Sequence, residues 1–231
     1  MLGTGVNVIA IVAGGLIGTV FGKIIPEKMR STILQGLGLA IMLIGLQMAI
    51  KTGNMLVVIA SLVLGAITGE LIDIEEKLNR LGKHLETRLS RQRHGRFTKA
   101  FVTASLVYCV GAMAIVGALQ DGLNGDHSIL FAKSALDGIT AVIFSASMGI
   151  GVIFAALPVL IYQGSISLFA GALQGILSDP VVLEMGAVGG LLILGIGINM
   201  LKIKEIKVAN LLPGIFIVIP VVIMFEYLGM Y

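Results

Sequence analysis

The chain has 231 residues, of which 57% are hydrophobic and only 13% are charged, and its mean hydropathy is +1.02. Soluble domains carry about 25% charged residues, so this composition excludes an ordinary soluble protein and indicates a polytopic membrane protein. The formal net charge of +3 reflects basic loops that are expected on one side of a membrane, and it gives no reason to expect a nucleic-acid partner. A single cysteine, Cys109, excludes an internal disulfide.

Apolar stretches of about 20 residues, the length that crosses a bilayer as a helix, recur along the whole chain. We predict eight spans, at about 6–25, 31–50, 55–72, 100–119, 129–156, 158–177, 181–201 and 208–228. The first lacks a basic leader and is expected to be a retained span rather than a signal peptide. Only Leu157 and Pro158 separate the fifth from the sixth, and Gly149 and Gly151 could end the fifth early or make it re-entrant. The expected fold is all-α, a single transmembrane domain over residues 1–231.

The basic residues test this count. Fourteen of the sixteen Lys and Arg lie in the loops after the first, third and seventh predicted spans, and eight spans place all three loops on one side. The other two are Lys51, on the opposite side, and Lys133, inside the fifth span. By the positive-inside rule the basic side is cytoplasmic, so both termini are expected to be extracytoplasmic.

The longest of these loops, residues 73–97, has a pattern of its own. Asp73 and Glu76 have the spacing of a capping box, and apolar residues then recur every three or four positions, at Ile74, Leu78, Leu81, Leu85 and Leu89. This predicts a cytoplasmic amphipathic helix with Lys and Arg opposite the apolar stripe. It could bind anionic membrane lipid, pair with a second copy, or cover the inner end of the bundle.

The stretch from Lys133 to Gly151 combines a lysine, an aspartate and several hydroxyls with an apolar run long enough to cross a bilayer. At 100° per residue, one narrow sector of this helix holds the small and polar positions, namely Lys133, Asp137, Thr140, Ser147 and Gly151, with Phe144 among them. Lys133 and Asp137 are four residues apart, so they can form an ion pair that lowers the free energy needed to bury either charge. Ionisable groups inside a membrane usually face a bundle interior or a hydrated path. The alternative places both charges in the headgroup region as topology anchors.

The first three and last three predicted spans share short motifs. Gly18-x-x-x-Gly22 before Pro26 resembles Gly171-x-x-x-Gly175 before Pro180, and G-L-Q-M at 45–48 resembles G-I-N-M at 197–200, at offsets of about 152–154 residues. The triplets begin five spans apart and therefore have opposite orientations. This predicts an inverted repeat of spans one to three and six to eight, the usual construction of secondary transporters. Alternatively, the glycines only pack helices or form the face of a homodimer.

Four further polar residues lie within predicted spans. Asn7 is in the first span, Gln163 follows Pro158 in the sixth, and Gln47 and Asn199 occupy matching positions of the proposed repeat. Each could contact a substrate or ion, or could simply make interhelical hydrogen bonds. The chain lacks a P-loop, an H-E-x-x-H zinc motif and a G-x-S-x-G nucleophile motif. We therefore expect no enzyme activity, no cofactor and no metal centre.

Three stretches together carry a family resemblance: the opening G-T-G-V-N-V-I-A-I-V-A-G-G-L-I-G, the middle S-A-L-D-G-I-T-A-V-I-F-S-A-S-M-G-I-G-V, and the closing G-I-N-M-L-K-I-K-E-I-K-V-A-N-L-L-P. In these the chain resembles the "domain of unknown function 554" family over nearly its whole length. The resemblance implies a multi-pass protein of the bacterial inner membrane, and it implies no reaction, substrate or site.

The residues favour an ion- or proton-coupled secondary transporter of a small solute or cation. Its expected path follows Lys133, Asp137, Thr140 and Ser147, with Asn7, Gln47, Gln163 and Asn199 as further contacts. The alternative is a non-transporting scaffold or sensor that dimerises and uses the 73–97 helix to bind lipid or a partner.

Overall fold

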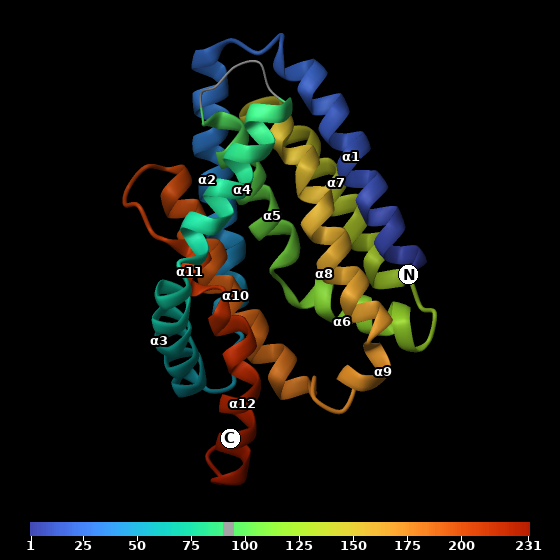
Figure 1. Cartoon of the computed structure of the whole chain (residues 1–231), viewed down its shortest axis with the longest axis vertical. Helices are drawn as coiled ribbons and strands as arrows, with labels where there is room; N and C mark the ends of the chain where they lie inside the picture. The colour runs from blue at the N-terminus through green and yellow to red at the C-terminus, as the bar shows by residue number, and fades with distance from the viewer. Residues whose placement is uncertain (90–94) are drawn as a thin grey trace. The chain divides into compact units, whose positions relative to one another are not determined.

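The computed structural model describes residues 1–89 and 95–231, and the regular secondary structure of these residues is helical throughout (Figure 1). The α-helices, in chain order, are α1 (Leu2–Gly22), α2 (Glu27–Ala49), α3 (Met55–Ile72), α4 (Ile74–Leu89), α5 (Arg96–Cys109), α6 (Ala112–Leu123), α7 (Ser128–Met148), α8 (Ala156–Leu168), α9 (Ala170–Leu173), α10 (Asp179–Met200), α11 (Val208–Leu211) and α12 (Pro213–Tyr227). A 3₁₀-helix, η1 (Ile150–Ala155), leads directly into α8. The predicted all-α, polytopic fold is confirmed.

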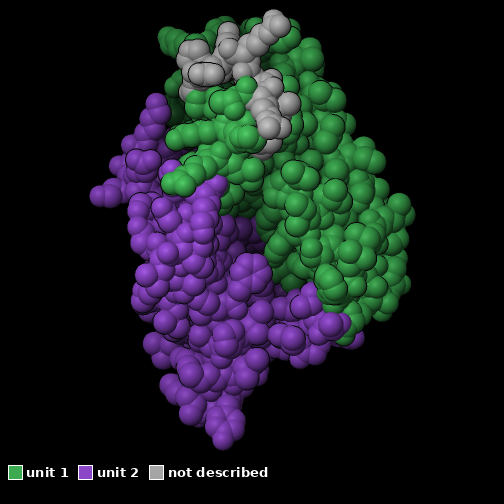
Figure 2. Space-filling view, viewed as in Figure 1, with its two compact units in different colours: residues 1–36, 78–109, 113–171 green, residues 37–77, 110–112, 172–231 purple. Residues whose placement is uncertain are grey.

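The chain divides into two compact units, coloured separately in Figure 2. Unit 1 comprises residues 1–36, 78–109 and 113–171, and unit 2 comprises residues 37–77, 110–112 and 172–231. Each unit is therefore assembled from segments far apart in the sequence. That the whole chain acts as a single transmembrane domain stays a prediction.

Unit 1 is built on the close contact of α1 with α7. A side chain added at Gly14, Gly18 or Gly22 would collide with the α7 backbone, at Gly138, Val142 and Ala146 respectively. These glycines are spaced four residues apart and form one ridge, so the two helix backbones approach as closely as in small-xxx-small membrane pairs. Ile11, Asn7 and Gly3 are the buried residues that continue this face toward the start of α1. The α1 glycine motif thus packs within the chain.

The contacts also fix helix directions. Gly14 meets Gly138 and Gly22 meets Ala146, so α1 and α7 run parallel. Gly15, by contrast, meets Ile153 while Met1 reaches Gly164, so α1 and the η1–α8 rod run antiparallel. In residues 1–89 and 95–231, seven helices are long and apolar enough to cross a membrane, and the bent pair α5–α6 makes up to eight. If α1, α2, α3 and α7 all cross, parallel α1 and α7 require one further crossing between α3 and α7, which favours counting α5–α6 as a span.

Several predicted boundaries are wrong. The span expected at 100–119 is broken into α5 and α6, which are bent by 60° near Gly111, a glycine with a φ of +143° that L-residues rarely adopt. The fifth span ends at Met148, not near residue 156, which confirms the alternative of an early end at Gly149: this glycine has a φ of +101° and stops the helix. The sixth therefore begins at η1, before Pro158, and ends at Leu168 instead of near residue 177.

The predicted amphipathic helix is present as α4, and residues 90–94 of the predicted 73–97 segment lie outside the described residues. Of the predicted stripe, Ile74 and Leu78 are half-buried, and the side chains of Leu85 and Leu89 lie outside the described part of the chain. Gly82 and Glu86 are buried, and Thr98 of α5 lies against Gly82 and donates to Glu86 Oε2 at 2.8 Å. Leu81 is exposed.

Unit 2 is organised by two antiparallel helix pairs. In the first, α2 crosses α10 where Gly45 meets Gly190 and Gly38 meets Gly197, backbone against backbone. In the second, α3 packs on α11 and α12, with Gly65 against Gly214 and Gly69 against Asn210. The missing side chains let the helices come close enough for extensive van der Waals contact, which replaces the hydrophobic effect as the source of stability in lipid.

Candidate functional site

A buried ion pair lies in the middle of unit 1. Lys133 Nζ donates to Asp137 Oδ2 at 2.5 Å, one turn apart on α7, and the two residues are only 6% and 7% exposed. Both belong to the face of α7 that packs inside the unit, whereas Leu136 and Ile139 on the opposite face are exposed. The headgroup-anchor alternative does not fit such burial, because an anchor keeps its charge in water.

Two neighbouring helices complete the cluster. Asn7 of α1 donates through Nδ2 to Asp137 Oδ2 at 3.0 Å and to Gln163 Oε1 of α8 at 3.2 Å. Asn7 and Gln163 are fully buried. Asn7 reaches this place because it shares the buried face of α1 with the glycine ridge, which holds α1 against α7. Lys133, Asp137, Asn7 and Gln163 are called the polar cluster below.

The polar cluster is not saturated with hydrogen bonds. Among the described residues, Asn7 Oδ1 and Gln163 Nε2 are buried without a hydrogen-bond partner, and so are the hydroxyls of Thr4 and Tyr108. Tyr108 of α5 is fully buried, stacks on Phe144 with ring centroids 6.1 Å apart, and lies near the Thr140 hydroxyl and within electrostatic range of Asp137. A buried polar group without a partner costs about 1–3 kcal/mol. Several such groups around one ion pair favour a binding site over a purely structural network.

The remaining predicted residues of α7 and η1 lie farther along the same unit. Thr140 is half-buried, and its hydroxyl donates to the Leu136 carbonyl at 2.9 Å, so it is engaged by its own helix. Ser147 is buried, and its hydroxyl and that of Ser145 have no partner in the described chain. Gly151 is not on α7 as predicted, because the helix ends before it; it packs against Phe97 of α5.

Gln47 and Asn199 belong to unit 2, whereas the polar cluster belongs to unit 1. Gln47 is exposed on α2. Asn199 brackets the loop after α10, donating to the Ile206 carbonyl at 2.7 Å and accepting from its N–H at 2.8 Å. These contacts give Asn199 a local structural role.

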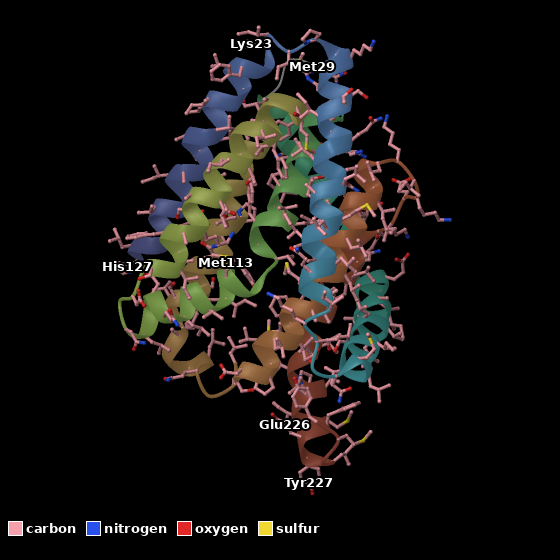
Figure 3. All side chains as sticks on the ribbon, turned by 180° about the vertical axis from the view of Figure 1, so that it is seen from behind. Lys23, Met29, Met113, His127, Glu226 and Tyr227 are labelled. Atoms are coloured by element: carbon pink, nitrogen blue, oxygen red, sulfur yellow. The ribbon has the colours of Figure 1, made fainter. Side chains whose placement is uncertain are left out.

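A second acidic centre in unit 1 is formed by Asp121, which the surrounding glycines and asparagine would place in an exposed loop and which is instead buried. Asp121, at the end of α6, is 4% exposed and lies 2.5 Å from His127 Nδ1, at the start of α7. It also accepts from Ser167 Oγ of α8 at 3.2 Å and from the N–H of Gly3 at 3.3 Å. It ties together four helix ends at the end of α1 that lies near His127, away from Lys23 (Figure 3). Its D-G-L-N-G sequence context, typical of a loop, concealed this.

Among the residues that the structure describes, no three His, Cys, Asp or Glu side chains are grouped to hold a metal ion. The polar cluster instead offers one carboxylate, one ammonium and two amides, and Tyr108 beside it adds a phenol. Such a set can exchange a proton and can hydrogen-bond a small polar solute.

Comparison with known proteins gives a family and relatives. The chain matches over residues 2–223 the family described as "Protein of unknown function (DUF554)". It is 33% identical over 227 residues to "Uncharacterized membrane protein YdfK" of Bacillus subtilis (strain 168), covering 96% of both chains. It is 32% identical over 224 residues to "Uncharacterized protein YqgA" of Escherichia coli (strain K12), covering 95% of both. No solved structure matches.

Proposed function

Because the chain belongs to the DUF554 family of membrane proteins, whose description assigns no activity, we propose from the geometry that it is an ion- or proton-coupled secondary transporter of a small solute. The family resemblance inferred from the three sequence motifs is confirmed. Location in the bacterial inner membrane, with both termini extracytoplasmic, belongs to the same proposal.

The buried Lys133–Asp137 pair carries the proposal. A charged side chain at the centre of a membrane helix costs about 2.5–3.5 kcal/mol by insertion scales, so an ion pair there is expensive unless it is used. A structural network would satisfy its members, whereas the amides of Asn7 and Gln163 both retain a buried atom without a described partner. A pair that can change protonation, next to unsatisfied donors and acceptors, fits a site that takes up and releases a solute.

The helix directions support the architecture that this function needs. An inverted repeat requires α1 and α8, α2 and α10, and α3 and α12 to have opposite directions, and each of these pairs packs antiparallel. Eight spans impose the same directions, so the repeat itself stays a prediction. One pair of proposed mates differs in environment: a side chain at Gly18 would collide with α7, whereas one at Gly171 would meet nothing.

The test is flux in proteoliposomes that contain a trapped pH indicator. Purified protein is exposed to inward gradients of cations, amino acids and small carboxylates, and a gradient that the protein couples to protons changes the internal pH. Asp137→Asn should reduce this response to that of protein-free vesicles, with flux expressed per correctly folded molecule because the variant leaves the Lys133 ammonium without its carboxylate partner. Asp126→Asn makes the same chemical change at an exposed position and should retain full flux. Unchanged flux in Asp137→Asn would refute the proposal.

A second function is favoured by a separate observation. The solvent-facing side of α4 exposes Leu81 together with Lys77 and Lys83, as a helix lying on anionic lipid would. A non-transporting scaffold or sensor would depend on this surface. The double variant Lys77→Gln/Lys83→Gln separates the two functions. A transporter with these changes should keep its flux. A scaffold should bind phosphatidylglycerol less strongly than wild type when both are placed in nanodiscs.

A further inference from the structure

We propose that the polar cluster carries one small monovalent carboxylate together with one proton, with Asp137 taking the proton and Lys133 binding the carboxylate. This inference rests on the proposed transport function and names its coupling ion and substrate class. It follows from the charge balance of the buried pair and from the unused donors around it.

In the observed state the site is electrically balanced, because the Lys133 ammonium is matched by the Asp137 carboxylate. A proton added to Asp137 alone would leave the ammonium unpaired, and an anion added alone would leave one negative charge in excess. Either state buries an uncompensated charge, which in proteins costs several kcal/mol. Proton and monoanion together give neutral Asp137 and an ammonium paired with the substrate, so the site is balanced again. Coupling of one proton to one monoanion is thus enforced electrostatically.

The surrounding donors suit a carboxylate. Gln163 Nε2 and the hydroxyls of Thr4 and Tyr108 are buried in unit 1 without a described partner. Asn7 Nδ2, which now donates to Asp137, would be available once that carboxyl is protonated. Two carboxylate oxygens accept about four hydrogen bonds, which this set can supply with the Lys133 ammonium. Charge-assisted bonds of this kind are about twice as strong as neutral ones.

A metal cation would bind poorly at the polar cluster. Its charge would be repelled by the Lys133 ammonium, because Nζ lies 2.5 Å from Asp137 Oδ2 and a metal ion bound to this carboxylate would lie close to that fixed positive charge. One carboxylate with two amide groups also falls short of the six to eight oxygen ligands that a hard cation such as calcium prefers.

Asp137 is the group expected to titrate. The ionisable neighbours are Lys133 on α7 itself, Tyr108 and Cys109 on α5, and Tyr162 of α8, which lies near Cys109. Helix α1 contributes no ionisable side chain between Leu2 and Gly22. Phenols and thiols give up a proton in water only above neutral pH, so a change between pH 5.5 and 7.5 acts on Asp137 before it acts on them.

The binding test uses thermal unfolding of the purified wild-type protein, followed by far-ultraviolet circular dichroism. Sodium lactate should raise the unfolding temperature, and lactamide, its neutral analogue, should not. Because one proton binds with the anion, the apparent affinity should fall by up to about tenfold per pH unit as Asp137 loses its proton. A shift that is larger at pH 7.5 than at pH 5.5, an equal shift with lactamide, or no shift with lactate would each overturn the proposal.

Variants separate the two roles. Asp137→Asn imitates the protonated acid, so lactate should stabilise this variant equally at pH 5.5 and pH 7.5. The charge-free double variant Lys133→Met/Asp137→Asn should show no lactate effect at either pH. Ser134→Ala, which removes a hydroxyl that donates to the Leu130 carbonyl of the same helix, is the local control and should behave as wild type. A lactate effect retained in the double variant would place the anion elsewhere.

Proteoliposomes then distinguish failure of this inference from failure of transport. An inward lactate or pyruvate gradient should acidify the lumen, and clamping the membrane potential with potassium and valinomycin should not change the rate. Proton movement driven by sodium, by a neutral amino acid, or by chloride and nitrate but not by carboxylates would preserve a transporter and overturn the carboxylate assignment. An internal pH that does not change with any gradient would refute the transport proposal itself.

Discussion

Asp137 in unit 1 and Glu184 in unit 2 are carboxylates buried inside helix bundles, and the two are satisfied in opposite ways. In unit 2, Glu184 of α10 is fully buried and accepts from the Thr52 hydroxyl at 2.6 Å and from the N–H groups of Gly53 and Asn54 at 2.7 and 3.0 Å. The Tyr231 hydroxyl adds a fourth bond at 3.1 Å. Burial, and then the Glu184 charge, raise the pKa of Tyr231 to about 12, so it stays a donor at physiological pH.

In unit 1, Asp137 depends on one ammonium and one amide, and its neighbours keep unused polar atoms. Glu184 thus accepts four hydrogen bonds from fixed donors, three of which belong to the turn between α2 and α3. Asp137 has a partner that can change and neighbours that can rearrange. The contrast teaches that burial of a charge does not itself mark a functional site, whereas incomplete satisfaction of its surroundings does.

The largest effect should come from breaking the unit 1 pair on one side. Lys133→Met leaves Asp137 buried with only the Asn7 amide, which should destabilise the fold by about 3–5 kcal/mol near neutral pH. Adding Asp137→Asn to this variant should recover most of the loss, because two neutral groups need no pairing. Thermal unfolding by circular dichroism, supported by labelling of the single thiol at Cys109, measures both. Equal stability of the single and double variants would show that the pair is not energetically coupled.

Removing the unit 2 carboxylate should have a smaller, purely structural effect. Glu184→Ala removes the acceptor of the Thr52 hydroxyl and of two part-buried backbone N–H groups at the start of α3, a loss of about 2–4 kcal/mol. Flux per correctly folded molecule should remain, because Glu184 belongs to unit 2 and the proposed path to unit 1. Fluorescence size-exclusion of solubilised protein normalises the flux. Loss of flux with unchanged folding would show that Glu184 has a role in transport. The distinction drawn between Glu184 and Asp137 would then be wrong.

The glycine ridge of α1 should rank next, because it holds Asn7 in place. Gly18→Val forces a side chain against the carbonyl of Val142, and overpacking of this kind costs about 1–3 kcal/mol. Gly5→Val, at an open position on the same helix, should be close to neutral. The unfolding temperatures of the two variants measure the difference. Similar losses at both positions would mean that helix propensity, and not the α1–α7 contact, sets the effect.

The sequence anticipates the features that follow from periodicity and from charge. The apolar runs predict the existence of the membrane helices, and the spacing of four predicts the Lys133–Asp137 pair, because both are local properties of a helix. The ends of the helices are less predictable. Gly149 and Gly111 stop or bend helices through their backbone conformations, while Gly18 and Gly45, chemically identical, lie inside long helices and pack them.

Only some of the residues that form the site can be predicted from the sequence. Asn7 and Gln163 were singled out as polar residues within spans, but that they meet each other and Asp137 depends on tertiary contacts 130 and 156 residues apart. Nothing in the sequence around Tyr108 or Thr4 indicates that they belong to the site, since each lies in an ordinary apolar stretch. Asp121 was misplaced because glycine and asparagine around it are typical of loops, and its burial is set by α1 and α8.

The smallest expected effect lies at the junction of α3 and α4, and its sign depends on pH. Burial raises the pKa of the Glu75 carboxyl, against a lowering by the N–H of Ala209, whose bond to Oε2 is 2.9 Å long. A raised folded-state pKa means that the folded protein holds the proton more tightly than the unfolded chain. Its stabilising contribution is therefore complete at acid pH and is lost as the pH rises through the folded-state pKa.

Glu75→Gln keeps an oxygen for the Ala209 N–H and removes the buried charge. The variant should therefore be more stable than wild type at pH 8, by less than about 1 kcal/mol, and should lose this advantage at pH 4. Unfolding at the two pH values measures the change, with Glu226→Gln, at the end of α12, as a control for the removal of one negative charge. An advantage that grows as the pH falls would mean that the ionised carboxylate stabilises this junction, as the fixed donors around Glu184 do in the same unit.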